Sequence, residues 1–81
     1  MKKDNKYFQT QDLNLSAVLL SKNFTLINTF KNVDGKSTFC FCIDKGLDDV
    51  IQQYWNNTLL INPQSLFNSL KTLKNRIYSN Y

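Results

Sequence analysis

Histidine and glutamate are absent from this sequence of 81 residues, and glycine and proline are scarce, with two Gly and one Pro. The lack of histidine removes the side chain that most often serves as a general base and as a metal ligand. The two glycines, Gly35 and Gly46, lie too far apart to build a glycine-rich phosphate-binding loop. We therefore expect a protein that is not an enzyme and that carries no metal or cofactor.

Long hydrophobic runs are also absent, because no stretch approaches the roughly 18–20 apolar residues that a membrane-spanning helix needs. The residues after Met1 are polar and do not form the apolar core of a signal peptide. These absences, together with a small number of cysteines, predict a cytoplasmic protein that does not contact a membrane.

Cysteine occurs only at Cys40 and Cys42. On a strand these two side chains share one face, with Cα atoms about 6.5–7 Å apart, which is a poor separation for a disulfide. One chain supplies two thiolates at most, whereas structural zinc takes four ligands. We interpret both cysteines as half-buried packing residues; a four-cysteine zinc site shared between two subunits is the alternative.

Positive charge is concentrated at the two ends of the chain, which has a net charge of +4. Residues 1–10 carry three Lys against one Asp, and residues 11–65 carry four Lys against five Asp. Residues 66–81 carry Lys71, Lys74 and Arg76 and no acid. Basic ends of this kind either bind an anionic partner or only keep the protein in solution.

Local sequence signals predict one α+β domain over residues 7–81, preceded by a flexible basic N-terminus at residues 1–6. The expected elements are an extended piece at 7–9, a hairpin at 24–43, a connector or strand at 59–61, and helices at about 11–22, 47–56 and 63–78. The order is therefore (β)αββα(β)α, a β-hairpin, with room for a short third strand, packed against three helices. Thr10 is the expected N-cap of the first helix, and Asn23 the left-handed residue that ends it.

The hairpin is predicted by Asp34-Gly35, a typical type I′ turn between two runs of β-forming residues. A two-residue loop at this position places Phe30 opposite Phe39. The same register gathers the large apolar side chains on one face and places Thr29 on the other.

The first helix has apolar residues on two opposite sides, of which the second is formed by Leu15, Val18 and Leu19. A surface helix needs only one apolar stripe. Either this helix is sandwiched between two layers of the fold, or its second side contacts another protein, including a second copy of the chain. Trp55 is a further candidate for such an interface, because it lies at the border of the second helix's apolar face.

The last helix carries the candidate ligand-binding residues. Asn62 is the expected N-cap of this helix and Pro63 its first residue, and its predicted buried stripe consists of Leu66, Leu70, Leu73 and Ile77. Lys71, Lys74 and Tyr78 share one flank of this apolar stripe, and Arg76 lies on the other rim. Two ammonium groups beside an aromatic ring are suited to a phosphate and a stacked base. Alternatively, the cations only complement the negative end of the helix dipole while Tyr78 packs at the edge of the core.

Several segments together resemble a family of short bacterial and phage proteins that is known only as a domain of unknown function. They are Phe8-x-Thr10-x-Asp12-Leu13, Phe39-x-Phe41, Tyr54-Trp55, Leu60-Ile61-Asn62-Pro63 and Leu70-Lys71-x-Leu73-Lys74-x-Arg76-Ile77-Tyr78. The resemblance covers about residues 7–78, and Asn23 stands where such proteins usually have a glycine. It implies a stand-alone accessory protein of bacteria or mobile elements and brings no catalytic residues.

Two hypotheses about function follow. In the first, the protein is a non-enzymatic accessory protein that binds an anionic ligand, either nucleic acid or a signal nucleotide that it sequesters, through Lys71, Lys74, Arg76 and Tyr78. A pocket for a nucleotide in so small a chain would form between subunits of a homo-oligomer. In the second, the protein is an interaction module that inhibits a host enzyme or defence complex through the second side of its first helix.

Overall fold

The computed structural model describes residues 7–79, whose elements follow the order βαββαα. They are β1 (Tyr7–Thr10), α1 (Leu13–Ser21), β2 (Leu26–Lys31), β3 (Ser37–Cys42), α2 (Leu47–Trp55) and α3 (Pro63–Ser79). The predicted α+β class, the hairpin and the three helices are confirmed. The flexible basic N-terminus predicted for residues 1–6 lies outside the described residues.

The third strand of the sheet is β1, which pairs antiparallel with β3 and gives the strand order β1-β3-β2. This pairing places Phe8 directly opposite Phe41. The alternative strand predicted at residues 59–61 is wrong, because residues 56–62 form an irregular connector. Lys22, which follows α1, contacts this connector: its Nζ donates a hydrogen bond to the backbone carbonyl of Leu60 at 2.9 Å.

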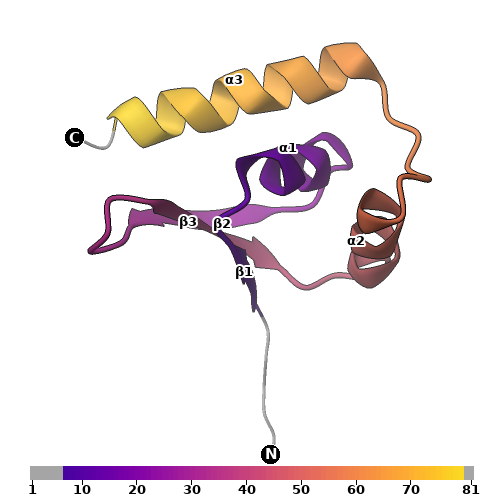
Figure 1. The fold of residues 1–81 in the computed structure, drawn as a ribbon, viewed down its shortest axis with the longest axis horizontal. Coiled ribbons are helices and arrows are strands. Elements are labelled where there is room, and N and C mark those ends of the chain that lie inside the picture. The colour runs from indigo at the N-terminus through magenta and orange to yellow at the C-terminus, as the bar shows by residue number, and fades with distance from the viewer. Residues whose placement is uncertain (1–6, 80–81) are drawn as a thin grey trace, which may run out of the picture.

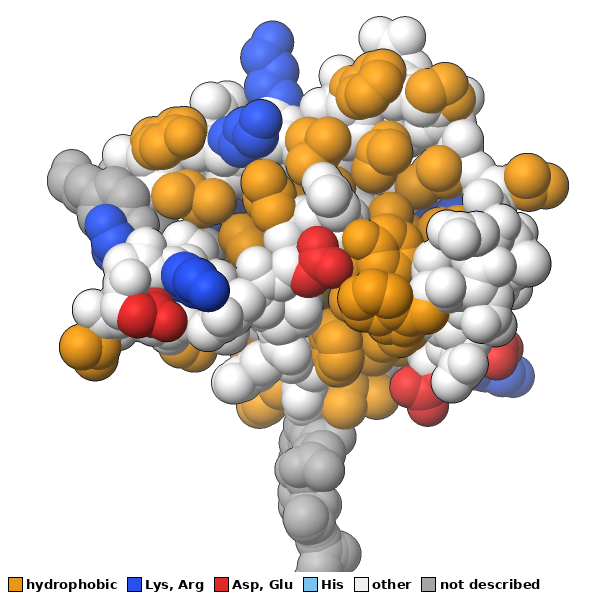
Figure 2. Space-filling model, viewed as in Figure 1, with side chains coloured by type: hydrophobic (Ala, Val, Ile, Leu, Met, Phe, Trp, Pro, Cys, Tyr) orange, Lys and Arg blue, Asp and Glu red, His pale blue; other side chains and the backbone are white. Residues whose placement is uncertain are grey.

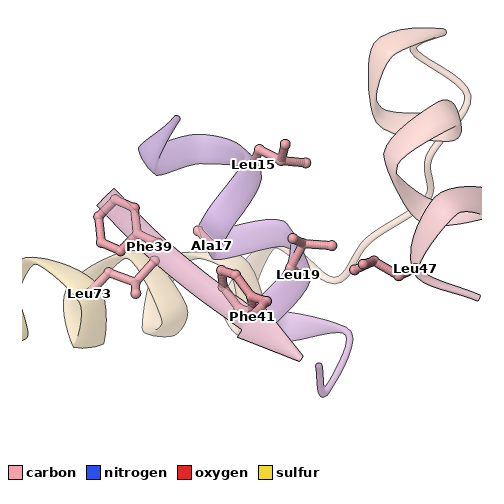
Figure 3. Close-up of a cluster of buried hydrophobic side chains, with 7 residues drawn as sticks. All are labelled: Leu15, Ala17, Leu19, Phe39, Phe41, Leu47 and Leu73. Carbon is pink, nitrogen blue, oxygen red and sulfur yellow. The ribbon is translucent and has the colours of Figure 1, made fainter. Parts of the chain in front are cut away.

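The fold is layered, with α1 over the sheet, α3 over α1, and α2 at one end (Figure 1). One cluster of buried apolar side chains joins these elements and contains Leu15, Ala17, Leu19, Phe39, Phe41, Leu47 and Leu73 (Figure 3). These side chains come from α1, β3, α2 and α3. The residues described therefore share one core, and α1 lies inside it.

The start of α1 differs from the prediction that Thr10 is its cap. Thr10 pairs with Phe39 in the sheet, and the N-cap is Asp12, whose Oδ1 accepts a hydrogen bond from the Leu15 amide at 3.1 Å. The hydroxyl of Thr10 instead accepts from the Asp12 amide at 3.1 Å. Because β1 uses residues up to Thr10, the helix begins two residues later than expected. The left-handed Asn23 that follows it is confirmed, with a φ of 72°.

Asp12 also contacts α2. The hydroxyl of Tyr54 donates to Asp12 Oδ2 at 3.4 Å. Burial of the Tyr54 side chain raises the pKa of its phenol, and the negative charge and the hydrogen bond of Asp12 raise it further. One carboxylate thus caps α1 with one oxygen and contacts α2 with the other.

The hairpin turn contains three residues rather than two. The Asn32 amide donates to the Lys36 carbonyl at 2.7 Å, and the Gly35 amide donates to the Asn32 carbonyl at 3.0 Å. Gly35 has a φ of 89°, but Asp34 is not among the described residues with positive φ. A type I′ turn requires positive φ at both positions, whereas a three-residue loop needs it only at the glycine.

The longer loop shifts the register of the hairpin by one residue. Thr29, rather than Phe30, lies opposite Phe39, and Phe30 lies opposite Thr38. Phe30 therefore turns to the other face of the sheet, where 40% of its surface is exposed. Thr29 turns toward the core, and its hydroxyl is buried without a hydrogen-bond partner in the structure. The predicted facing is therefore wrong for Thr29 and Phe30, whereas Leu26, which lies beyond a shift in the strand register and opposite Phe41, packs against the core as predicted.

Candidate functional site

Helix α3 is the longest helix among the described residues, with 17 residues from Pro63 to Ser79. It begins as the sequence predicts: Asn62 Oδ1 accepts a hydrogen bond from the Ser65 amide at 3.1 Å, and Pro63 takes the first helical position. No helix of the described residues is both long and apolar enough to cross a membrane.

One face of α3 packs against the rest of the protein. Leu73 is fully buried, and Leu66, Leu70 and Ile77 are partly buried against the same core. The predicted apolar stripe is therefore confirmed. Because this stripe fixes how the helix is rotated about its axis, it also decides which of the remaining side chains face the solvent.

A second line of side chains runs along the exposed side of α3. It consists of Phe67, Lys71, Lys74 and Tyr78, which are separated by four, three and four residues and are all exposed. Residues at these spacings are neighbours on a helix surface. We call these four residues the α3 flank. Figure 2 shows lysine or arginine side chains close to hydrophobic ones along the edge of the molecule where α3 runs (Figure 1).

The α3 flank contains three of the four predicted ligand-binding residues but not Arg76. Arg76 is two residues from both Lys74 and Tyr78, which places it on the opposite side of the helix, about 200° away. It lies in the last turn, where a cation complements the helix dipole. The structure therefore does not bring the four predicted residues into one site.

Helix-dipole stabilisation accounts less well for the two lysines of the flank. Lys71 and Lys74 precede the end of α3 at Ser79 by eight and five residues. The dipole effect falls off within the last turn. Moreover, no Asp or Glu occurs between Pro63 and Ser79, so that nothing on this helix neutralises the two ammonium groups. Tyr78 does not pack at the edge of the core as the alternative prediction held, since 72% of its surface is exposed.

Phe67 was not among the ligand-binding residues predicted from the sequence. In the structure, 65% of its surface is exposed. Its spacing from Lys71 and Lys74 is visible in the sequence. The exposure of its ring is not visible there, because an apolar residue beside the partly buried Leu66 is ordinarily expected at the margin of the core. It extends the cationic pair into a line with an aromatic ring at each end.

Two grooves on the described surface are lined by residues outside the α3 flank. A groove of about 240 Å³ is lined by Gln9, Thr10, Gln11 and Thr38. A second groove, of about 280 Å³, is lined by Val18, Tyr54, Asn57, Leu59, Ile61 and Leu66. None of the flank residues lines either of these two grooves, and all four are exposed on one face of α3.

The residues predicted to form a protein interface are separated by the fold. Leu15, Val18 and Leu19 are buried within the chain, with 2%, 4% and 0% of their surfaces exposed. The sandwich explanation of the doubly apolar helix therefore holds, and these three residues are unavailable to a partner. Only Trp55 is exposed, at 63%, and its ring contacts Tyr54 edge to face with centroids 4.9 Å apart.

These features define a small layered α+β protein in which one helix presents a cationic and aromatic flank to the solvent. The chain belongs to the family described as Domain of unknown function (DUF5659), whose match covers residues 5–79. This confirms that the chain resembles a family known only as a domain of unknown function. Comparison with the curated proteins and with the solved structures gives no match.

Proposed function

We propose that this protein is a non-enzymatic binding protein for nucleic acid and that the lysines of the α3 flank contact the phosphates. The observation that carries the proposal is the exposure of Lys71 and Lys74 side by side on a helix without acidic residues. Lysine ammonium groups at such positions replace condensed counterions on a phosphate backbone, which favours binding through counterion release.

A polyanion fits this surface better than a single nucleotide does. Small ligands bind in concave sites that cover most of their surface. All four flank residues are exposed along one face of α3, and none of them lines the grooves of about 240 and 280 Å³. An extended strand gains its affinity from several phosphate contacts along its length and needs no enclosing pocket.

The second apolar side of α1 no longer supports the protein-interaction hypothesis, because Leu15, Val18 and Leu19 are core residues. Of the four residues predicted for that interface, only Trp55 is exposed, and it lies on α2 and not on the α3 flank. We expect the protein to act in the cytoplasm, where free thiols such as those of Cys40 and Cys42 stay reduced.

The proposal is tested by measuring the affinity for a fluorescently labelled oligonucleotide at several salt concentrations. We expect the double variant Lys71→Ala/Lys74→Ala to bind more weakly and to reduce the slope of log K against log salt by about 1.4, or about 0.7 for each lost phosphate contact to a single strand. The matched control is Lys36→Ala/Lys45→Ala, which removes the same charge from two exposed lysines outside α3. Equal slopes for the two double variants would show that general charge, and not the α3 flank, attracts the ligand.

A further inference from the structure

The aromatic residues of the α3 flank have a feature that phosphate binding leaves unexplained. Phe67 and Tyr78 leave 65% and 72% of their surfaces exposed to solvent, although large aromatic side chains contribute most when they are buried. Phe67 has no polar atom that would gain from contact with water. Both rings lie in line with the two lysines, on the side of α3 turned away from the buried Leu73.

The order of the residues along the flank is aromatic, lysine, lysine, aromatic. Phe67 and Tyr78 are eleven residues apart, which corresponds to about 16 Å along the helix axis. About five phosphates span the same length at roughly 3.4 Å each, the spacing along one strand of a duplex, and an unstacked strand, which is more extended, spans it with fewer. An unstacked strand laid along the flank would bring phosphates in its middle to the lysines and bases near its two ends to the rings.

We propose that the α3 flank binds unpaired nucleotides, with Phe67 and Tyr78 stacking on bases on either side of the phosphates held by Lys71 and Lys74. This inference rests on the nucleic-acid binding proposed above and names the class of strand. In a duplex the faces of the bases are covered by their neighbours, so aromatic side chains have nothing to stack on. In a single strand every base offers a free face, and stacking on aromatic residues tolerates any sequence.

The chemistry of the flank favours this ligand over an apolar protein surface. A hydrophobic partner would bury Lys71 and Lys74 together with the rings, and burying unpaired ammonium groups is costly. A single strand meets both kinds of side chain at once, because it alternates anionic phosphates with flat apolar bases. The absence of carboxylates from residues 63–79 adds charge complementarity with a polyanion.

The test measures the affinity of the full chain for one labelled oligonucleotide, free and annealed to its complement. We expect the single strand to bind more tightly than the duplex, and Phe67→Ala and Tyr78→Ala each to weaken single-strand binding roughly 5- to 150-fold, as expected for the loss of one stacked base. The salt dependence should stay unchanged in these two variants, because no phosphate contact is lost. Phe67→Tyr, which keeps an aromatic ring, should bind the single strand about as tightly as the unmodified protein does.

The matched control is Trp55→Ala, which removes an equally exposed aromatic side chain from α2 and should leave the affinity unchanged. Equal affinity for single strand and duplex, with Phe67→Ala neutral, would overturn the inference. In that case a lower salt slope in Lys71→Ala/Lys74→Ala would still support phosphate binding by the flank. Failure of both strands to bind the unmodified protein would overturn the proposed function as well.

Discussion

Helices α1 and α3 both carry more large apolar side chains than one buried stripe requires, and the structure treats the excess in opposite ways. In α1 the five consecutive residues from Leu15 to Leu19 are buried, because the sheet covers one side and α3 the other (Figure 1). In α3 the additional aromatic residues, Phe67 and Tyr78, stay exposed. An excess of apolar residues in a helix therefore indicates an interface only for those residues that are not buried within the chain itself.

The largest expected effect comes from truncating one side chain in each helix, which tests whether the apolar residues of α1 are buried and the additional ones of α3 are exposed. Leu19→Ala should lower the free energy of unfolding by about 2–5 kcal/mol, because it opens a cavity at a fully buried position. Phe67→Ala should change it by about 0.5 kcal/mol or less, as for an exposed position. Urea denaturation measures both values. A large loss in Phe67→Ala would mean that this ring packs against the protein, contrary to its proposed role in binding a ligand.

A smaller effect distinguishes the observed hairpin register from the one that the turn sequence predicts. Thr29→Val removes a buried hydroxyl without a hydrogen-bond partner and should raise the free energy of unfolding by about 1 kcal/mol. Thr25→Val, at an exposed position just before β2, is the control and should have little effect. In the register of a two-residue turn, Thr29 would face away from Phe39, and its replacement would bring no gain over the control.

The smallest expected effect is the contribution of the Tyr54 phenol to folding stability, which changes only at high pH. Because the pKa of Tyr54 is raised in the folded protein, the protonated phenol stabilises the fold fully below the ordinary tyrosine pKa of about 10. This contribution is lost as the pH rises further, since the unfolded chain then releases the proton more readily. Stability curves of the unmodified protein and of Tyr54→Phe should therefore converge or cross above about pH 10. Parallel curves in this range would show that the Tyr54 pKa is not raised.

The sequence predicts those parts of the fold that local signals determine. Asn62-Pro63 specifies the start of α3, Asn23 specifies the end of α1, and the spacing of Leu66, Leu70, Leu73 and Ile77 specifies the buried side of α3. The register of the hairpin is not determined in this way. Asp34-Gly35 is compatible with a two-residue and with a three-residue loop, and the two loops differ by one residue in pairing.

The sequence also does not determine which segment forms the third strand, because residues 7–10 and 59–61 are both short extended candidates without clear periodicity. Only the tertiary fold decides which of them reaches the free edge of β3. The same holds for the site. Spacing places Phe67 in line with Lys71, but the exposure of its ring depends on how α3 is rotated against the core.

The central claim is that the α3 flank binds single-stranded nucleic acid, and the most direct test is to map the contact by NMR. The protein, labelled with ¹⁵N, is titrated with a short single-stranded oligonucleotide while the backbone amide signals are followed. We expect the largest shifts between Phe67 and Tyr78, with little change in the sheet and in α2. Shifts centred on Trp55 or on the β-sheet, or no shifts at all, would contradict it.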